Sequence, residues 1–354
     1  MSAPRSVSKA VRLHRASNRW LGPLWVWAVL LVLVIVAIYT VPEFASIDNA
    51  KNILRQAVPL AIVTIGQTAV IVLGGIDLSV AAVLALGNTL SMGLMDGGEG
   101  SMLLAILLPL LAGLLVGTIN GLVVARTAAP AFIVTLGAAS VVQGIVFWYT
   151  SSGPYGSPSL SFGELGFKEY GPLPALVVFF IPLLVAGLIV QNRTRTGRHI
   201  YAVGDDDRVA ERAGVHVARV KVGVYALSGV LAALAGIAVA TRTGSGDPLA
   251  GVGFDWDSVA AAVIGGAVLV GGRGTIGGAM AGVLIIAVID NAMTLKDVSA
   301  FWQSTVKGVI VLVAVIIAAL AAKDVLRTYL RRGPMSNFKH PPPAGSASKG
   351  GAGA

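Results

Sequence analysis

Stretches without charged side chains alternate with short polar segments along almost the whole chain. Each stretch is a candidate membrane helix, because a bilayer core about 30 Å thick needs about 20 apolar helical residues and an ionised side chain in its middle is costly. The pattern predicts ten helices, at about residues 20–40, 54–73, 78–95, 102–124, 131–150, 172–190, 222–240, 258–270, 274–290 and 303–322. The two stretches between 258 and 290 are short and interrupted by glycine, which leaves open a count that differs by one or a helix broken at membrane depth.

The composition agrees with a protein that lies in a membrane. Of 354 residues, 55% are hydrophobic and 12% are charged, whereas an ordinary soluble domain has about 25% charged residues. Glycine is abundant, with 44 residues, but no Gly-X-Y period accompanies it, so collagen is excluded. The absence of cysteine excludes disulfides, thiolate metal sites and a cysteine nucleophile. The predicted fold class is all-α, a polytopic membrane protein.

The distribution of basic residues predicts the orientation in the membrane. With ten spans, 20 of the 26 Lys and Arg residues fall on one side, in both termini, the segment Arg193–Lys221 and two short turns. Because short cytoplasmic loops are enriched in Lys and Arg, both termini and this segment are expected to be cytoplasmic. The net charge of +9 is therefore interpreted as a topology signal, and no nucleic-acid partner is expected.

Three regions follow from this arrangement. Residues 1–19 form a basic cytoplasmic tail, residues 20–322 the transmembrane domain with a cytoplasmic loop at 192–221, and residues 323–354 a second basic tail. The last region is rich in glycine and proline and is expected to be disordered. A cleavable signal peptide is the alternative for the start, but the apolar run at 20–40 exceeds the usual length of about 7–15 residues and no A-x-A site follows it.

The chain has no motif for enzymatic chemistry of its own. It lacks the G-x-x-x-x-G-K-[ST] phosphate loop, so any ATP and Mg²⁺ must be used by a partner protein. Its four histidines fall in the tails or in the cytoplasmic loop. No catalytic residue, metal site or bound cofactor is therefore predicted. The intramembrane carboxylates Asp77 and Asp290 lie near predicted helix ends, which favours an interfacial carboxylate or a helix cap over an ion site.

The cytoplasmic loop contains the pattern of a short helix. Three aspartates, Asp205–Asp207, precede the segment Arg208–Ala213, and Gly214 follows it. Acidic residues are stabilised near the positive N-terminal end of a helix, and glycine commonly ends one. A small docking helix under the membrane is predicted, with an ordinary solvated loop as the alternative.

Several sequence blocks resemble, in order, the permease subunits of ribose-type ABC importers, a branch related to branched-chain amino acid permeases. The blocks are Gly74–Ser79 with Val80–Gly87, Ile119–Gly121, Pro130–Gly137, Thr196–Gly204, Tyr225–Gly229, Gly244–Pro248, Ala260–Gly266 and Gly271–Thr275. The resemblance covers about residues 50–322. It implies a permease in the bacterial inner membrane that pairs with a second copy, a cytoplasmic ABC ATPase and an extracytoplasmic solute-binding protein to import a monosaccharide.

The resemblance and the helix pattern together assign a set of loop residues to coupling with the ATPase, with Ala210 and Gly214 expected in the contact surface. This set is Gly197, Arg198, Gly204, Asp206, Asp207, Ala210 and Gly214. Polar residues within the spans are candidates for the substrate path, because a sugar needs hydrogen-bond partners but no full charge; interhelical hydrogen bonding is an equal alternative for the uncharged ones. These candidates are Gln67, Asp77, Ser79, Asn88, Asn120, Thr135 and Gln143.

Other functions stay open at this point. Relatives within the resembled family also carry autoinducers, nucleosides or branched-chain amino acids, so the cargo is another small polar solute in the first alternative. An ion-coupled secondary transporter and a non-transporting membrane scaffold are the alternatives from other classes.

Overall fold

The computed structural model describes residues 24–98, 101–127, 129–299, 301–310, 312–313 and 316. Both predicted tails, and the outermost residues of the first and last predicted spans, lie outside the described residues. Within the described part, the regular secondary structure is helical apart from one two-stranded antiparallel hairpin, formed by β1 (Glu169–Tyr170) and β2 (Leu173–Pro174).

The helices follow the predicted order. They are a first helix at Leu24–Thr40, α2 (Ile47–Val72), α3 (Val80–Met95), α4 (Met102–Arg126), α5 (Ala131–Thr150), α6 (Leu160–Leu165), α7 (Ala175–Arg193), α8 (Arg195–Asp205), α9 (Asp207–Arg212), α10 (Val217–Thr243), α11 (Phe254–Ile264), α12 (Ile276–Leu295) and a last helical stretch that includes residues 301–310. Among the described residues, α2, α4, α5, α7, α10 and α12 are long and apolar enough to cross a membrane, and Leu24–Thr40 and α3 are shorter apolar helices.

The predicted span at 258–270 is wrong in its extent. Helix α11 begins at Phe254 and stops at Ile264, and the chain then forms a loop up to Thr275. The glycines of this loop explain the stop, because Gly266, Gly271 and Gly272 have φ values of 90°, 95° and 71°, in a region that L side chains rarely adopt.

Local sequence fixes several helix starts. The hydroxyl of Ser46 accepts the N–H of Asn49 at the start of α2, and the hydroxyl of Thr275 accepts the N–H of Gly278 at the start of α12. Such a hydroxyl pairs an amide that the first helical turn leaves unpaired.

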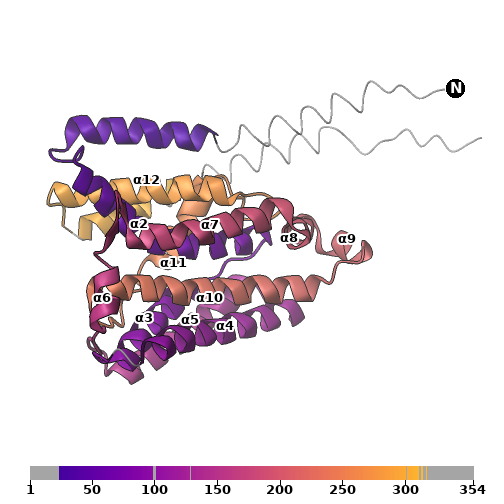
Figure 1. Cartoon of the computed structure of the whole chain (residues 1–354). Coiled ribbons are helices and arrows are strands. Elements are labelled where there is room, and N and C mark those ends of the chain that lie inside the picture. Colours follow the sequence, from indigo (N-terminus) through magenta and orange to yellow (C-terminus); the bar gives the residue numbers. More distant parts are fainter. Residues whose placement is uncertain are drawn as a thin grey trace, which may run out of the picture.

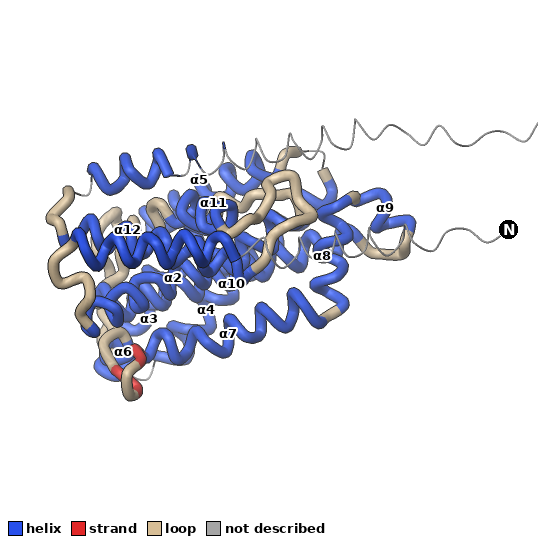
Figure 2. The backbone as a smooth tube through the Cα atoms, turned by 90° about the horizontal axis from the view of Figure 1, so that it is seen from above, coloured by secondary structure: helices blue, strands red, loops and turns tan. Residues whose placement is uncertain are grey.

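The long helices run side by side in two layers (Figure 1). Helices α2, α7 and α12 lie in one layer and α10, α3, α4 and α5 in the other, while α8 and α9 project at one end. The opposite end carries α6 and the hairpin, which the view from above shows beside each other (Figure 2). Two polar ends separated by the length of the helices are what a membrane-spanning bundle requires.

Helix α10 is the centre of the bundle and packs against α2, α3 and α4. Three glycines at four-residue spacing on α4, Gly113, Gly117 and Gly121, face it. A Cβ atom on Gly113 or Gly117 would overlap a backbone oxygen of α10, and one on Gly121 would lie 2.7 Å from the Cα of Val222. Small residues at this spacing let two membrane helices approach closely enough for backbone contact.

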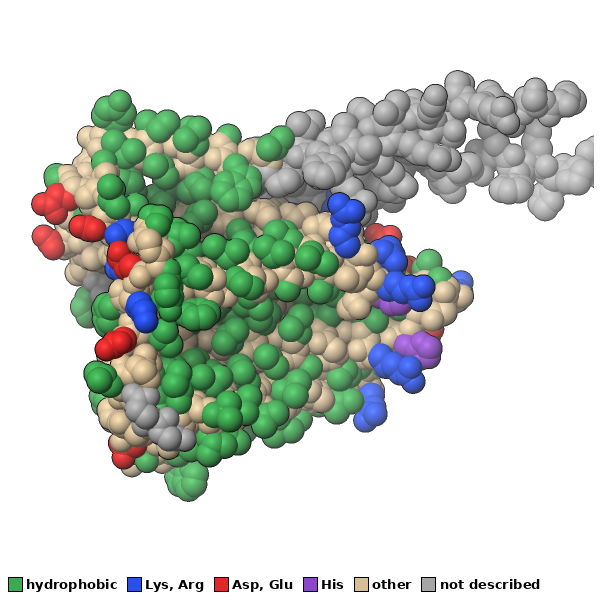
Figure 3. All heavy atoms as spheres, viewed as in Figure 1, with side chains coloured by type: hydrophobic (Ala, Val, Ile, Leu, Met, Phe, Trp, Pro, Cys, Tyr) green, Lys and Arg blue, Asp and Glu red, His purple; other side chains and the backbone are tan. Residues whose placement is uncertain are grey.

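Burial separates inner helices from outer ones. In α2, α10 and α12, 83%, 67% and 67% of the most apolar stretch is buried, whereas the values for α4, α5 and α7 are 22%, 17% and 17%. The outer helices therefore expose broad apolar surfaces, which cover much of the face in Figure 3. Soluble monomers do not expose apolar surface on this scale, so the fold is that of a polytopic membrane protein.

Charge is distributed unequally between the two ends. Lys, Arg and His side chains gather around α8 and α9, while the opposite end, near α6, carries acidic side chains beside a few basic ones (Figure 3). The segment Arg193–Lys221, which holds many of the basic residues counted above, forms the basic end.

Candidate functional site

The basic end of the molecule is built from α8 and α9. The sequence pattern predicts a short helix after the three aspartates, and the structure has it as α9 at Asp207–Arg212. The side chain of Asp206 accepts the N–H groups of Arg208 (2.8 Å) and Val209 (3.0 Å). The chain turns at Gly214 with φ of 84°. Helix α8, in contrast, has no counterpart in the sequence analysis, which treats its residues as loop.

Two glycines fix α8 against the ends of the membrane helices. A Cβ atom on Gly197 would overlap the carbonyl oxygen of Val190 at the end of α7. One on Gly204 would overlap the carbonyl oxygen of Val72 at the end of α2 and lie 2.9 Å from the nitrogen of Gly272. Since the N–H of Gly272 also donates to the carbonyl of Val72 (2.9 Å), α8 touches two inter-helix turns at once.

The side chains of α9 divide between the membrane domain and the surface. Ala210 is 3% exposed and packs in a cluster with Val203, Val224 and Tyr225, so it does not lie in an exposed contact surface as the sequence analysis expects. Asp207 pairs with Lys221 on α10. The outward surface instead presents Val209, which is 60% exposed.

The remaining coupling candidates lie at the same end. Arg198, Asp206 and Gly214 are exposed, and nothing lies within 4 Å of the position of a Cβ atom on Gly214. The structure therefore brings all seven candidates onto one end of the molecule, but only some of them to its surface.

Four path candidates meet at the turn between α2 and α3. One carboxyl oxygen of Asp77 accepts the N–H (3.0 Å) and the hydroxyl (2.6 Å) of Ser79, and the other accepts the hydroxyl of Ser228 on α10 (2.9 Å). The amide of Asn120 on α4 donates to the hydroxyl of Ser79 (2.9 Å). Thr135 on α5 accepts the N–H of Leu78 (3.1 Å) and donates to the carbonyl of Ile76 (3.1 Å). We call Asp77, Ser79, Asn120, Thr135 and Ser228 the Asp77 cluster.

The Asp77 cluster is sealed inside the bundle. All five side chains are at most 2% exposed, and Asp77 is 0% exposed. Asp77 accepts from Ser79, the residue that precedes α3, and from no N–H group of the helix itself, so it is neither a cap of α3 nor an interfacial carboxylate. The cluster joins the turn to α4, α5 and α10, so its polar groups satisfy one another instead of lining an open path.

Ser228 and Tyr225 have no assigned role in the sequence analysis. The signal was present for Ser228, because it is a polar position inside an apolar span, like the candidates that were selected. Tyr225 is 1% exposed, and its hydroxyl would overlap a Cβ atom on Gly75. This hydroxyl has no hydrogen-bond partner among the described residues.

The other path candidates differ in what they bind. Asn88 and Gln143 hold the backbone of the segment between α10 and α11, through Asp247 and Pro248. Gln67 on α2 is 0% exposed, and neither polar atom of its amide has a partner among the described residues.

Asp290 belongs to an ion-pair group that joins three helices. Lys307 on the last helical stretch lies 3.2 Å from a carboxyl oxygen of Asp257 on α11 and 2.8 Å from one of Asp290 on α12. The expectation of an interfacial carboxylate at Asp290 is therefore incomplete, since this side chain pairs with Lys307. Within the described part of the chain, no group of three or more His, Cys, Asp or Glu side chains is placed to hold a metal ion.

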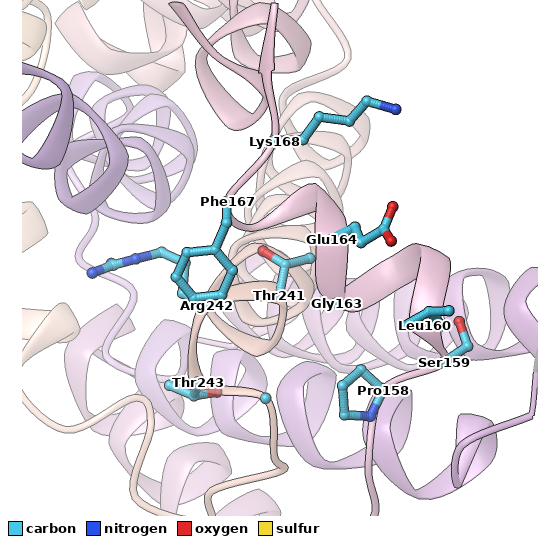
Figure 4. A pocket seen from close by; sticks show the side chains of 11 residues that line it. Pro158, Ser159, Leu160, Gly163, Glu164, Phe167, Lys168, Thr241, Arg242 and Thr243 are labelled. Atoms are coloured by element: carbon cyan, nitrogen blue, oxygen red, sulfur yellow. The ribbon is translucent and has the colours of Figure 1, made fainter.

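The end opposite α8 and α9 contains a cavity of about 780 Å³. It lies between α6, the residues that follow α6, and the C-terminal end of α10 (Figure 4). Its lining includes Glu164, Phe167, Lys168, Thr241 and Arg242. The end opposite α8 and α9 thus has a hollowed, mainly apolar surface with a few charged side chains in its lining.

The hairpin at this end is tied to α2 by Glu169. Its two carboxyl oxygens accept from Lys51 (2.7 Å) and Arg55 (2.6 Å). The hydrogen bond from Lys51, together with Arg55, holds the pKa of the Glu169 carboxyl below its usual value. Neither ion pair is visible in the sequence, since the partners are more than 110 residues apart.

The lowered pKa of Glu169 predicts that its ion pairs hold the hairpin to α2 in a pH-dependent way. A carboxyl whose pKa falls on folding adds stability above its unfolded pKa, and that stability is lost as the pH falls through the folded pKa. We expect Glu169→Gln to loosen the hairpin at pH 7, measured as faster proteolysis there, and to change nothing at a pH below both pKa values. Equally faster proteolysis of the variant at both pH values would contradict a pH-dependent contribution of these ion pairs.

Comparison with known proteins places these features in a family. The chain matches the family described as the branched-chain amino acid transport system permease component over residues 49–319. The ribose import permease protein RbsC of Haemophilus influenzae is 38% identical over 292 residues, which cover 81% of this chain and 90% of that protein. RbsC of Bacillus subtilis is 38% identical over 296 residues with the same shares. The xylose transport system permease protein XylH of Escherichia coli is 31% identical over 334 residues, covering 77% and 85%. No solved structure matches the chain.

The matched region runs from α2 into the last helical stretch. It therefore includes the Asp77 cluster, α8, α9, and every candidate residue of the path and of the coupling loop. On the extent of this match and on the identity of the relatives, the chain belongs to the family of branched-chain amino acid transport system permease components.

Proposed function

We propose that this chain is the transmembrane subunit of an ATP-driven importer for a monosaccharide such as ribose, and that two copies work with an ATPase and a solute-binding protein. The chain is a multi-pass permease of a bacterial ABC importer, and ATP is used by a partner subunit. The observation that carries the proposal is the backbone contact of α8 with the turns after Val72 and at Gly272. Backbone atoms in direct contact cannot move independently of each other. A displacement of α8 and α9 by an ATPase therefore moves the helices on both sides of these turns.

The cargo is inferred from the relatives and from the buried polar groups. The relatives named above are permeases for ribose and xylose, which are both pentoses. Buried polar side chains of the bundle are mostly hydroxyls and amides, which suit a neutral, hydroxyl-rich solute better than an ion. Gln67 is the path candidate whose amide is not already engaged within the described residues. The alternative is another small polar solute, such as an autoinducer, a nucleoside or a branched-chain amino acid.

We infer ten membrane-spanning segments, one of them made by α11 together with the non-helical segment before it, with both termini and the α8–α9 end in the cytoplasm. The charge distribution supports this orientation, since basic side chains gather at the α8–α9 end and cytoplasmic loops are enriched in them. The same orientation puts α6, the hairpin and the cavity outside, where a binding protein delivers the solute. The coupling set keeps Gly197, Arg198, Gly204, Asp206, Asp207, Ala210 and Gly214, with Ala210 acting by holding α9 to α10 instead of by direct contact.

Reconstitution tests the proposed function. Vesicles that contain the chain, its partner ATPase and the binding protein are expected to take up labelled ribose when ATP is present, and to continue when ionophores collapse ion gradients. The chain alone is expected to hydrolyse no ATP, because it has no phosphate loop. Uptake that needs an ion gradient and not ATP would support a secondary transporter and overturn the proposal.

A substitution on the outward face of α9 tests the coupling surface. Val209→Glu puts a charge at a position that is 60% exposed, so the chain folds normally. If an ATPase covers Val209, burying that unpaired charge costs several kcal/mol, and we expect ribose uptake and stimulated ATP hydrolysis to fall together by at least about tenfold. Ser346→Glu in the C-terminal tail is the control and is expected to change neither. Normal transport by the Val209 variant would show that α9 is an uncovered connector.

A further inference from the structure

Between α10 and α11 the chain leaves helical conformation and runs inward along α3. We call Gly244–Gly253 the inward segment. Near its start, Gly246 pairs with Tyr155, and a Cβ atom on Gly246 would lie 3.0 Å from the Cα of Thr89. Near its end, a Cβ atom on Gly251 would overlap the carbonyl oxygen of Ala81. Ala81 lies about 21 Å along α3 from the outer end of that helix at Met95, at 1.5 Å per residue. The inward segment therefore takes non-helical backbone deep into the bundle.

Two side chains hold the inward segment in place. The amide oxygen of Asn88 on α3 accepts the N–H of Asp247 (2.7 Å), and its amide nitrogen donates to the carbonyl of Gly236 on α10 (3.3 Å). The amide of Gln143 on α5 donates to the carbonyl of Pro248 (2.9 Å). These amides satisfy main-chain groups of the inward segment that would otherwise be costly to place away from water. Asn88 and Gln143 thus act as positioning residues for the segment and not as direct partners of a solute.

The most exposed large side chains of the inward segment and of the start of α11 are apolar. Leu249, Val252 and Trp256 follow one another at spacings of three and four residues and are 55%, 73% and 56% exposed. They belong to the inward segment and to the first turn of α11, a helix of 11 residues that is too short to cross a bilayer.

Lipid is a poor environment for a segment of this kind. Non-helical backbone at membrane depth is tolerated only where it is buried in protein or lines a water-filled cavity. In transporters, helices broken at the middle of the membrane mark the substrate site. An apolar constriction in such a path blocks passage by excluding water until it widens.

We propose that the inward segment lines the solute path and that Leu249, Val252 and Trp256 form its apolar gate, held in position by Asn88 and Gln143. This inference rests on the proposed function, because it assumes that a solute crosses the membrane through this protein. The three gate residues are not among the path candidates that the sequence pattern predicts. It also moves two path candidates, Asn88 and Gln143, from contact with the solute to support of the gate.

Single cysteines test the proposal directly, since the chain has none of its own. Val252→Cys and Leu249→Cys change exposed side chains and keep an apolar group of similar or smaller size. Leu115→Cys, at a position on α4 that is 61% exposed and midway along an outer helix, is the matched lipid-facing control. In vesicles with the partner ATPase, a water-soluble, membrane-impermeant maleimide is expected to label Val252→Cys at least about tenfold faster than Leu115→Cys. Labelling of Leu249→Cys and Val252→Cys as slow as that of the control would overturn the gate.

A leak measurement tests closure. Val252→Ala combined with Trp256→Ala is expected to let labelled ribose escape from loaded vesicles without ATP, at least about fivefold faster than the unchanged chain, whereas Leu115→Ala has no effect. Gln143→Leu in the Val252→Cys background is expected to change the rate of maleimide labelling severalfold, because it frees Pro248. An unchanged leak in the double variant would show that these side chains do not close the path.

The outcomes separate this inference from the proposed function. Fast labelling of Val252→Cys in a chain that shows no ATP-driven ribose uptake would refute the sugar importer and keep the path. ATP-driven uptake by a chain whose Val252→Cys variant is transport-competent but never labels would keep the importer and refute the gate.

Discussion

Replacing Gly204 with valine is expected to reduce coupled transport strongly while leaving the membrane bundle intact. A Cβ atom at this position would overlap the carbonyl oxygen of Val72 and crowd the nitrogen of Gly272, so α8 has to move away from both turns. Overpacking of this kind costs about 1–3 kcal/mol, which lowers the equilibrium constant for docking of α8 by about 5- to 150-fold. ATP-driven ribose uptake in reconstituted vesicles is expected to fall by a similar factor.

Gly223→Val is the matched control for this prediction. Gly223 lies on α10 near the same end of the molecule, and nothing lies within 4 Å of the position that its Cβ atom would occupy. The control therefore adds the same side chain in open space, and uptake is expected to stay near that of the unchanged chain. Equal uptake by the Gly204 and Gly223 variants would show that the contact of α8 with Val72 does not transmit the ATPase cycle.

Replacing Asp77 with leucine is expected to have the largest effect on stability. The side chain is 0% exposed and accepts three hydrogen bonds within the Asp77 cluster. Leucine leaves the N–H and hydroxyl of Ser79 and the hydroxyl of Ser228 without that acceptor, and each unsatisfied buried group costs about 1–3 kcal/mol. The purified variant is expected to lose at least several kcal/mol of stability, measured as a lower midpoint of thermal unfolding in detergent and a low yield.

Asp77→Asn is the matched control, because it keeps the approximate shape of the side chain and can still form hydrogen bonds. Its amide oxygen still accepts from Ser79, and its amide nitrogen donates to the hydroxyl oxygen of Ser228, which accepts as well as donates. We expect this variant to unfold within a few degrees of the unchanged protein. A leucine variant as stable as the asparagine variant would show that the cluster does not hold the turn between α2 and α3.

The sequence by itself determined the architecture at the level of spans. Long charge-free stretches of about 20 residues indicate membrane helices, and the observed apolar helices from α2 to α12 follow the predicted order. It also determined α9, because a cap at Asp206 and a stop at Gly214 act within a few residues of each other along the chain. Local rules of this kind do not depend on the rest of the fold.

Tertiary structure alone decided what the polar residues do. Asp77, Asn120 and Ser228 are far apart in sequence, and whether their side chains line a path or bind each other depends on how α3, α4 and α10 pack. Ala210 shows the same limit, since a small residue on a short helix is equally suited to an exposed contact or to the buried packing that it has.

The inward segment could not be predicted for a related reason. The sequence shows short, glycine-interrupted stretches after residue 258, but the hydrogen bonds of Asn88 and Gln143 place Asp247 and Pro248 inside the bundle. Hydropathy records whether a residue prefers to leave water, and it carries no information on which distant amide satisfies a given backbone group. Spans and caps were therefore fixed by local physical chemistry, whereas the hydrogen-bond partners that define the candidate site were decided only by long-range packing.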